Sequence, residues 1–176
     1  MSDHEKVARL IVDAKGRVVG RTRLQKTAYL LETAGLGDGF RFFYNHYGPY
    51  SEQLAMAISQ GDLVREEEKP TNWGGTYSIY TTTLVDGSAK SGVRHDLIAL
   101  ATAANPVALE LAATAVFFSR AGESDPWAVT AVRKPLKARD YLDAAKSLYR
   151  QLKGIETPNP WPDLNCSAAN AAVRAD

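Results

Sequence analysis

Side chains that commonly carry catalysis are few and scattered in this sequence. The three histidines, His4, His46 and His95, share no metal-ligand spacing, and the sequence contains neither a P-loop nor an H-E-x-x-H motif. Cys166 is the single cysteine, and it follows a run of prolines where we expect no rigid base to activate its thiol. The sequence therefore predicts a protein that is not an enzyme and that uses no metal and no cofactor.

A dense aromatic segment points instead to binding. Residues 40–51 hold six aromatic side chains together with His46. A short strand that delivers phenylalanines to the core explains the Phe side chains, with Gly48-Pro49 making the turn into the next helix. Tyr47 and Tyr50 flank that turn, and tyrosine is favoured at protein interfaces. We expect these two tyrosines to lie at a protein-binding surface.

Two tryptophans lie in segments where we expect few residues of the same domain to pack against them. Trp73 stands between Asn72 and Gly74 at the tip of a predicted hairpin. It either folds back as structural cover or anchors a partner. Trp161 lies among alternating prolines, where it is either filler in a disordered segment or part of a short motif that docks on another protein.

The elements that position these residues are mostly helical. Apolar residues recur at helical spacing over 7–14, 24–34, 54–58, 93–104, 106–117 and 141–152. Thr22 and Gln25 have the form of a capping box, and cap-plus-proline pairs begin two later helices. Residues 16–20 predict a turn, 40–44 a short strand, and 63–66 with 76–82 a long hairpin. The helix at 106–117 is apolar around most of its circumference, so we expect it to be central.

The order of the first elements is that of a winged helix-turn-helix, a fold that usually places its third helix and wing on DNA. We therefore predict an α+β, mostly helical fold, with a winged-helix-like half followed by a helical bundle. The predicted reading helix, 51–60, contains no Lys or Arg. The wing over 62–69 carries two basic residues against four acidic ones, so both surfaces repel phosphate. A fold reused for protein contact is the favoured interpretation.

The basic residues cluster elsewhere, and one cluster keeps nucleic acid open as an alternative. Lysines and arginines gather over 15–26 and 133–139. The first group is the candidate contact with nucleic acid or an acidic partner: Arg17, Arg21, Arg23 and Lys26.

Composition sets broad limits on the chain. Its 176 residues have a net charge of +1, with 45% hydrophobic and 23% charged residues, typical of a globular domain. The polar N-terminus is unlike a secretory signal, and no apolar run reaches the length of a membrane span. We expect a cytoplasmic protein with one domain over residues 1–154 and a flexible, Pro- and Ala-rich tail over 155–176.

Three segments of the chain have the form of sequence motifs: Arg21-Thr-Arg-Leu-Gln-Lys26 with Tyr29, Tyr47-Gly-Pro-Tyr-Ser51 followed by Leu54 and Glu66, and Leu109-Glu-Leu-Ala-Ala-Thr114 followed by Lys134-Pro135. They resemble the Panacea domain, also called the SocA-like antitoxin domain, in its YwgA-like branch. The similarity spans roughly residues 20–135, and its middle segment is the most specific. The first segment is similar to the family's K-L-Q-K-L-x-Y helix, the second to Y-G-P-x-S…L…G-L-I-x-E, and the third to L-E-L-A-A-T…K-P. In this chain they are residues 21–31, 47–66 and 109–135.

The resemblance implies a non-catalytic antitoxin that neutralises a partner protein toxin by direct binding. The family's namesake is a proteolytic adaptor that hands its toxin to the ClpXP protease. One surface would then hold the toxin, and the tail over 155–176 would suit contact with ClpX, because a flexible tether raises effective concentration. The alternative is a DNA-binding transcriptional regulator, or an antitoxin that also regulates its own operon.

Overall fold

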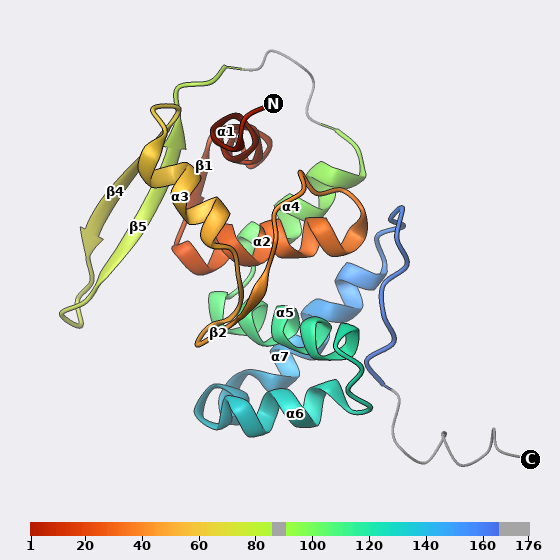
Figure 1. Cartoon of the computed structure of the whole chain (residues 1–176). Helices are drawn as coiled ribbons and strands as arrows, with labels where there is room; N and C mark the ends of the chain where they lie inside the picture. The colour runs from red at the N-terminus through yellow and green to blue at the C-terminus, as the bar shows by residue number, and fades with distance from the viewer. Residues whose placement is uncertain (86–90, 166–176) are drawn as a thin grey trace, which may run out of the picture.

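The computed structural model describes residues 1–85 and 91–165, and it confirms the mostly helical α+β fold (Figure 1). The described elements follow one another as α1 Asp3–Asp13, β1 Arg17–Val19, α2 Arg21–Ala34, β2 Phe43–Asn45, β3 Gly48–Tyr50, α3 Glu52–Gln60, β4 Val64–Pro70, β5 Thr76–Thr82, α4 Val93–Ala103, α5 Pro106–Arg120, α6 Pro126–Arg133 and α7 Pro135–Lys153.

The first half has the element order of a winged helix, with one small hairpin inserted. Strands β1, β5 and β4 form an antiparallel sheet in that order, and β4 and β5 project as the wing (Figure 1). The prediction of a simple turn over 16–20 is wrong, because Arg17–Val19 pairs with residues 79–81 of β5. Three residues carry too little local pattern to reveal a strand that only a distant partner stabilises. The inserted hairpin, β2–β3, lies between α2 and α3.

Helix ends follow the local signals in most places. Asn105 and Asp125 cap α5 and α6 through their side chains, and Gly35 closes α2 in the left-handed conformation. The predicted capping box at Thr22 is wrong: α2 begins at Arg21, so Thr22 lies inside the first turn. Its N-cap is Gly20, which has a φ of 94° and offers no side chain. Pro135 begins α7 rather than merely ending α6, as proline at the first helical position does.

Helix α5 is the centre of the second half, as its sequence predicts. Leu109, Leu111 and Val116 are fully buried, and most of the helix surface is covered. In Figure 1, α5 lies between α2 above and α6 and α7 below, so it joins the winged-helix unit to the helical bundle. Because α5 touches both halves, side chains on it can connect the bundle to the inserted hairpin.

Residues 155–165 are packed, which corrects the first part of the predicted flexible tail. Leu164 is 2% exposed, and the ring of Trp161 lies edge-on to Tyr149 with 6.3 Å between ring centroids. The backbone N–H of Asn159 donates to the Ala34 carbonyl at 3.0 Å, and this bond connects the segment to the end of α2. The apolar residues here are too irregularly spaced to signal packing. Residues 166–176, including Cys166, lie outside the described residues.

The described helices fall short of what a bilayer requires. Within residues 1–85 and 91–165, no helix is both long and apolar enough to cross a membrane.

Candidate protein-binding hairpin

The aromatic segment forms a two-stranded hairpin rather than one strand. Strand β2 pairs antiparallel with β3, placing Phe43 opposite Tyr50 and Asn45 opposite Gly48. Gly48 and Pro49 therefore belong to a strand and do not simply break one. Gly48 has a φ of 83°, and a Cβ there would lie 2.4 Å from the Thr114 hydroxyl oxygen. Only glycine meets both conditions, so this position ties the hairpin closely to α5.

Two adjacent side chains on α2 hold the returning strand by its backbone. The Gln25 amide group donates to the Ser51 carbonyl at 3.0 Å, and its oxygen accepts the Ser51 N–H at 2.9 Å. The Lys26 ammonium donates to the Pro49 carbonyl at 2.7 Å. Both side chains are buried. The first segment of the family resemblance thus binds the second one directly.

A buried ion-pair cluster holds the hairpin turn from the other side. Glu110, on α5, pairs with Lys134 and with Lys137, each at 2.7 Å. The Lys134 ammonium also donates to the His46 carbonyl at 2.8 Å. Glu110 is 3% exposed and Lys134 7% exposed. Consequently the third segment of the resemblance converges on the same hairpin, and all three segments form one structural unit.

Two buried lysines, Lys26 and Lys134, and the half-buried Lys137 share the surroundings of one carboxylate, so this cluster is rich in positive charge. Burial lowers the pKa of Lys26 to about 8, because the charged ammonium is removed from water. Glu110 opposes this change, whereas the positive charges of Lys134 and Lys137 add to it. Lys26 is 1% exposed, so it serves the hairpin and not a solvent-facing partner.

This environment predicts a distinctive dependence of stability on pH. Folding lowers the pKa of Lys26 from 10.5 to about 8, so the unfolded state binds more protons between those values. The free energy of unfolding therefore rises with pH in this window, by about 1 to 1.5 kcal/mol between about pH 7 and pH 9. We expect Lys26→Met to lose this rise when urea unfolding is measured across that range. If the free energy of unfolding rose equally with pH in the unmodified chain and in Lys26→Met, the lowered pKa would not belong to Lys26.

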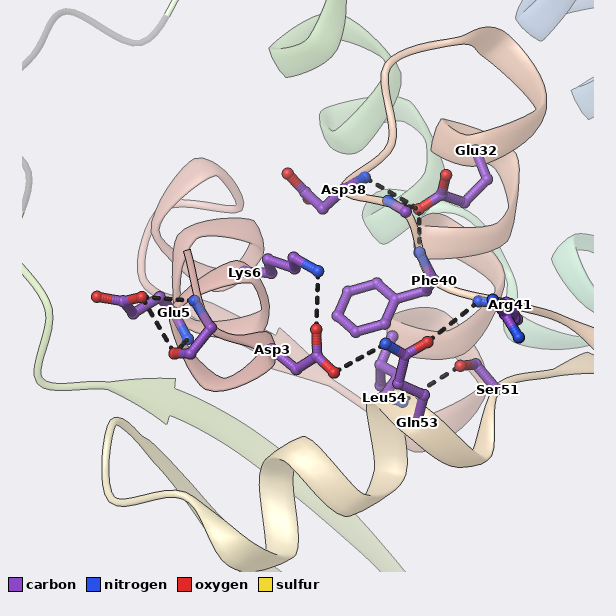
Figure 2. A network of polar contacts seen from close by, with 12 residues as sticks. Asp3, Glu5, Lys6, Glu32, Asp38, Phe40, Arg41, Ser51, Gln53 and Leu54 are labelled. Carbon is purple, nitrogen blue, oxygen red and sulfur yellow. Dashed lines mark hydrogen bonds and ion pairs between the residues drawn. The ribbon is translucent and has the colours of Figure 1, made fainter.

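The loop that enters the hairpin is also fixed by side chains, as Figure 2 shows. One carboxylate oxygen of Glu32 accepts the backbone N–H groups of Asp38, Gly39 and Phe40 at 2.8–2.9 Å. The amide of Gln53, on α3, bridges the Arg41 N–H and the Asp3 carboxylate (Figure 2). The backbone is thus held before, within and after the hairpin.

Several aromatic side chains of the hairpin are exposed. Phe43 is 69% exposed and Tyr47 58% exposed, and the Lys137 ammonium lies 4.8 Å from the centroid of the Tyr47 ring. Arg133 lies over the Tyr44 ring at 5.9 Å. We name this region the hairpin surface; it comprises Phe43, Tyr44, His46, Tyr47, Arg133 and Lys137. None of these residues is acidic, so the surface is apolar and positive.

The four aromatic residues proposed from sequence do not share one surface. Tyr47 lies on the hairpin surface, whereas Tyr50 is half-buried beside Arg21 and Met56. Trp73 extends from the wing tip with 93% of its surface exposed. Trp161 is packed against Tyr149, so its interpretation as a free docking motif is wrong.

The fold divides the basic cluster over 15–26 between different surroundings. Lys26 is buried, and Arg23 donates to the carbonyls of Val19 and Ala104 at 3.1 Å. Arg21 pairs with Glu66 on the wing at 3.3 Å. Arg17 is exposed on β1. The proposed contact role is therefore wrong for Lys26. Arg21 faces the wing, whereas Arg17 and Arg23 line one cleft together with Lys15.

Several residues of the site were missed at the sequence level. Phe43 was assigned to the core, but β2 is exposed along its whole length. Gln25 was assigned to a capping box, and it instead binds the backbone of Ser51. Glu110 and Lys134 were given no role in a site. Glu110 could have been found from the sequence, because a glutamate within an apolar helix is a buried charge that needs a partner. Within the described ranges, no group of three or more His, Cys, Asp or Glu side chains is placed to hold a metal ion.

Comparison with known proteins gives a partial match. The chain is similar to the uncharacterized protein YwgA of Bacillus subtilis (strain 168), with 31% identity over 94 residues. The match covers 51% of this chain and 54% of YwgA, so the chain spans about half the length of the curated relative it matches. No family model matches the chain. The resemblance to YwgA is confirmed over this region, and the wider family assignment stays a prediction.

Proposed function

We propose that this chain is a non-catalytic antitoxin of the Panacea, or SocA-like, type, which binds and neutralises a protein toxin through the hairpin surface. The observation that supports this proposal is that buried polar side chains hold the backbone of a hairpin whose aromatic side chains are exposed. These side chains are Gln25 and Lys26 on α2 and Lys134 between α6 and α7. Buried ionic groups are costly, and a rigid binding surface is a function that such a cluster serves. This role would place the protein in the cytoplasm.

The chemistry of the hairpin surface defines the expected partner. Exposed Phe and Tyr side chains with neighbouring Arg and Lys resemble the centres of protein interfaces, where aromatic residues and arginine supply much of the binding energy. Because Arg133 and Lys137 border Tyr44 and Tyr47, the matching toxin surface carries an apolar pocket rimmed by Asp or Glu.

DNA binding is the competing function, and the charges in the structure do not favour it. The exposed positions of α3 include Glu52, Met56 and Gln60 but no basic residue. On the wing, three consecutive glutamates, 66–68, are exposed, and Lys69 pairs with Glu67 at 2.7 Å. Phosphate contacts need free Lys or Arg, so these surfaces fit a protein better than a duplex.

Proteolytic delivery to ClpXP is the second part of the proposal. Residues 155–165 pack on the bundle, so deleting the whole of 155–176 would remove Leu164 from the core and confound folding with delivery. A truncation after Asn165 keeps these contacts and is the variant in which to test a role for the remaining residues with ClpX.

Salt dependence of binding separates the two functions. We expect the purified chain to bind the product of a neighbouring gene with an affinity that changes by less than about tenfold between about 50 and 200 mM salt. Promoter binding through phosphates would lose about a thousandfold or more over that range. Isothermal titration calorimetry with each candidate measures this. Steeply salt-dependent promoter binding, with no affinity for the protein, would contradict the proposal.

A further inference from the structure

A second feature lies away from the hairpin surface, between the α1–β1 corner and helix α4. A cleft of about 700 Å³ opens there, a volume in the range of small-molecule sites. Its apolar lining comes from β1 and α4: Val18, Val19, Ala99 and Ala103. None of the residues that line it belongs to the hairpin surface. The cleft is therefore structurally independent of the proposed toxin site.

Three cationic side chains line this cleft: Lys15, Arg17 and Arg23. Within the described residues, none of the three forms an ion pair. Backbone carbonyls of Val19 and Ala104 fix the Arg23 guanidinium through Nε and Nη1. Its Nη2 group has no hydrogen bond in the described part of the chain. The guanidinium is thus oriented by the fold and keeps a free donor.

The helix end that carries Lys15 is also well defined. Gly16 N–H donates to the Ile11 carbonyl and Lys15 N–H to the Val12 carbonyl, the pattern of a Schellman motif. Lys15 occupies the left-handed position, with a φ of 63°, where glycine is the usual residue. A lysine at this position is conformationally unfavourable compared with glycine.

The carboxylates near the cleft do not neutralise these cations. Asp13 is 8% exposed and is engaged by Arg94 at 2.9 Å and by His95 at 3.3 Å. The remaining carboxylate in the lining is Asp96, in the first turn of α4. Three cations therefore face one carboxylate that has no ion-pair partner in the described residues, and the cleft has a positive excess above an apolar floor.

We propose that this cleft binds a small organic anion, one with a flat or aliphatic body and a phosphate, sulfonate or carboxylate group. The body lies on the valines and alanines of β1 and α4, and the acidic group is held by Lys15, Arg17 and Arg23. This site adds a small-molecule ligand to a protein whose proposed partner binds elsewhere. Its loss leaves the hairpin surface unchanged, so the two proposals fail separately.

Two naphthalene dyes of matched shape test this proposal with the full chain. The probes are anilinonaphthalene sulfonate and uncharged phenylnaphthylamine, followed by fluorescence. We expect one saturable site for the anionic dye and affinity at least about tenfold higher than for the neutral dye, one charge contact being worth about that factor. Lys15→Gly and Arg17→Gln should each remove most of the difference. Arg9→Gln, an exposed arginine of α1 outside the cleft, is the matched control.

The melting temperature of each variant shows whether a loss of dye binding comes from a folding defect. Lys15→Gly places glycine at a left-handed position, so its melting temperature should equal or exceed that of the unmodified chain. A loss of dye affinity in that variant is then a loss of charge. Equal affinity for both dyes, or unchanged affinity in Lys15→Gly and Arg17→Gln, would overturn the proposal. Displacement of the dye by a short DNA duplex would overturn it too, by assigning the cations to nucleic acid.

Discussion

Glu110→Gln is expected to lower the free energy of unfolding by about 3 to 5 kcal/mol, the cost of removing one partner from a buried ion pair. Lys134 is 5% exposed at its side chain and loses its only carboxylate partner in the described structure, while Lys137 loses the same charge. Glutamine keeps the shape of glutamate, so the loss reports charge and not volume. Urea unfolding followed by circular dichroism measures it.

Asp140→Asn is the matched control for that experiment. It removes a carboxylate that pairs with Arg139 at 3.2 Å on an exposed surface, with both side chains more than half exposed. Solvent screens such exposed pairs, so they contribute little to stability, and the control should unfold almost as the unmodified chain does. If Glu110→Gln behaved like Asp140→Asn, the ion-pair cluster would not be holding the hairpin.

The double substitution Phe43→Ala with Tyr47→Ala should weaken toxin binding by about a hundredfold or more. Central aromatic residues of interfaces each contribute about 2 kcal/mol or more, and about 1.4 kcal/mol corresponds to a factor of ten in affinity. Both side chains are mostly exposed, so the free energy of unfolding should change by less than about 1 kcal/mol. Calorimetric titration with the purified toxin measures the affinity.

Trp73→Ala provides the comparison, because Trp73 is an even more exposed aromatic residue but lies on the wing tip. We expect the Trp73→Ala variant to bind the toxin with the same affinity as the unmodified chain. The opposite pattern, in which Trp73→Ala abolishes binding and the double variant does not, would move the binding surface to the wing.

The sequence predicted those features that local chemistry determines. The helices of the second half, the caps at Asn105 and Asp125 and the central position of α5 all follow from periodicity and capping residues. The wing and the winged-helix order of helices and strands could also be predicted, because strands β4 and β5 are adjacent in the chain. Each of these features depends on residues close together in sequence.

Features that depend on distant contacts were not predicted correctly. Strand β1 exists through its pairing with β5, some sixty residues away in sequence, and the pattern of Arg17–Val19 alone does not show it. Phe43 was assigned to the core because a phenylalanine usually packs there, whereas β3 takes the inner position. Lys26 was read as a surface charge, yet the Pro49 carbonyl supplies a buried acceptor for it.

The contacts of the hairpin explain why three separate sequence segments occur together. Gln25 and Lys26 hold the backbone at Ser51 and Pro49, and Thr114 packs against Gly48. Replacing the polar residues of one segment would leave buried polar groups of another segment without hydrogen-bond partners. Each group left without a partner would cost about 1 to 3 kcal/mol of stability. The three segments therefore form one structural unit that shapes the hairpin surface, and we propose that this surface binds the toxin.

Site-specific photo-crosslinking in living cells tests that claim most directly. A photoreactive phenylalanine is placed at Phe43, at Trp73 or at Arg9, three exposed positions on the hairpin, the wing and α1. We expect the probe at Phe43 to give a discrete, nuclease-resistant adduct with one protein, and the probes at Trp73 and Arg9 to give none. A nuclease-sensitive adduct, or a protein adduct from Trp73 alone, would contradict the claim.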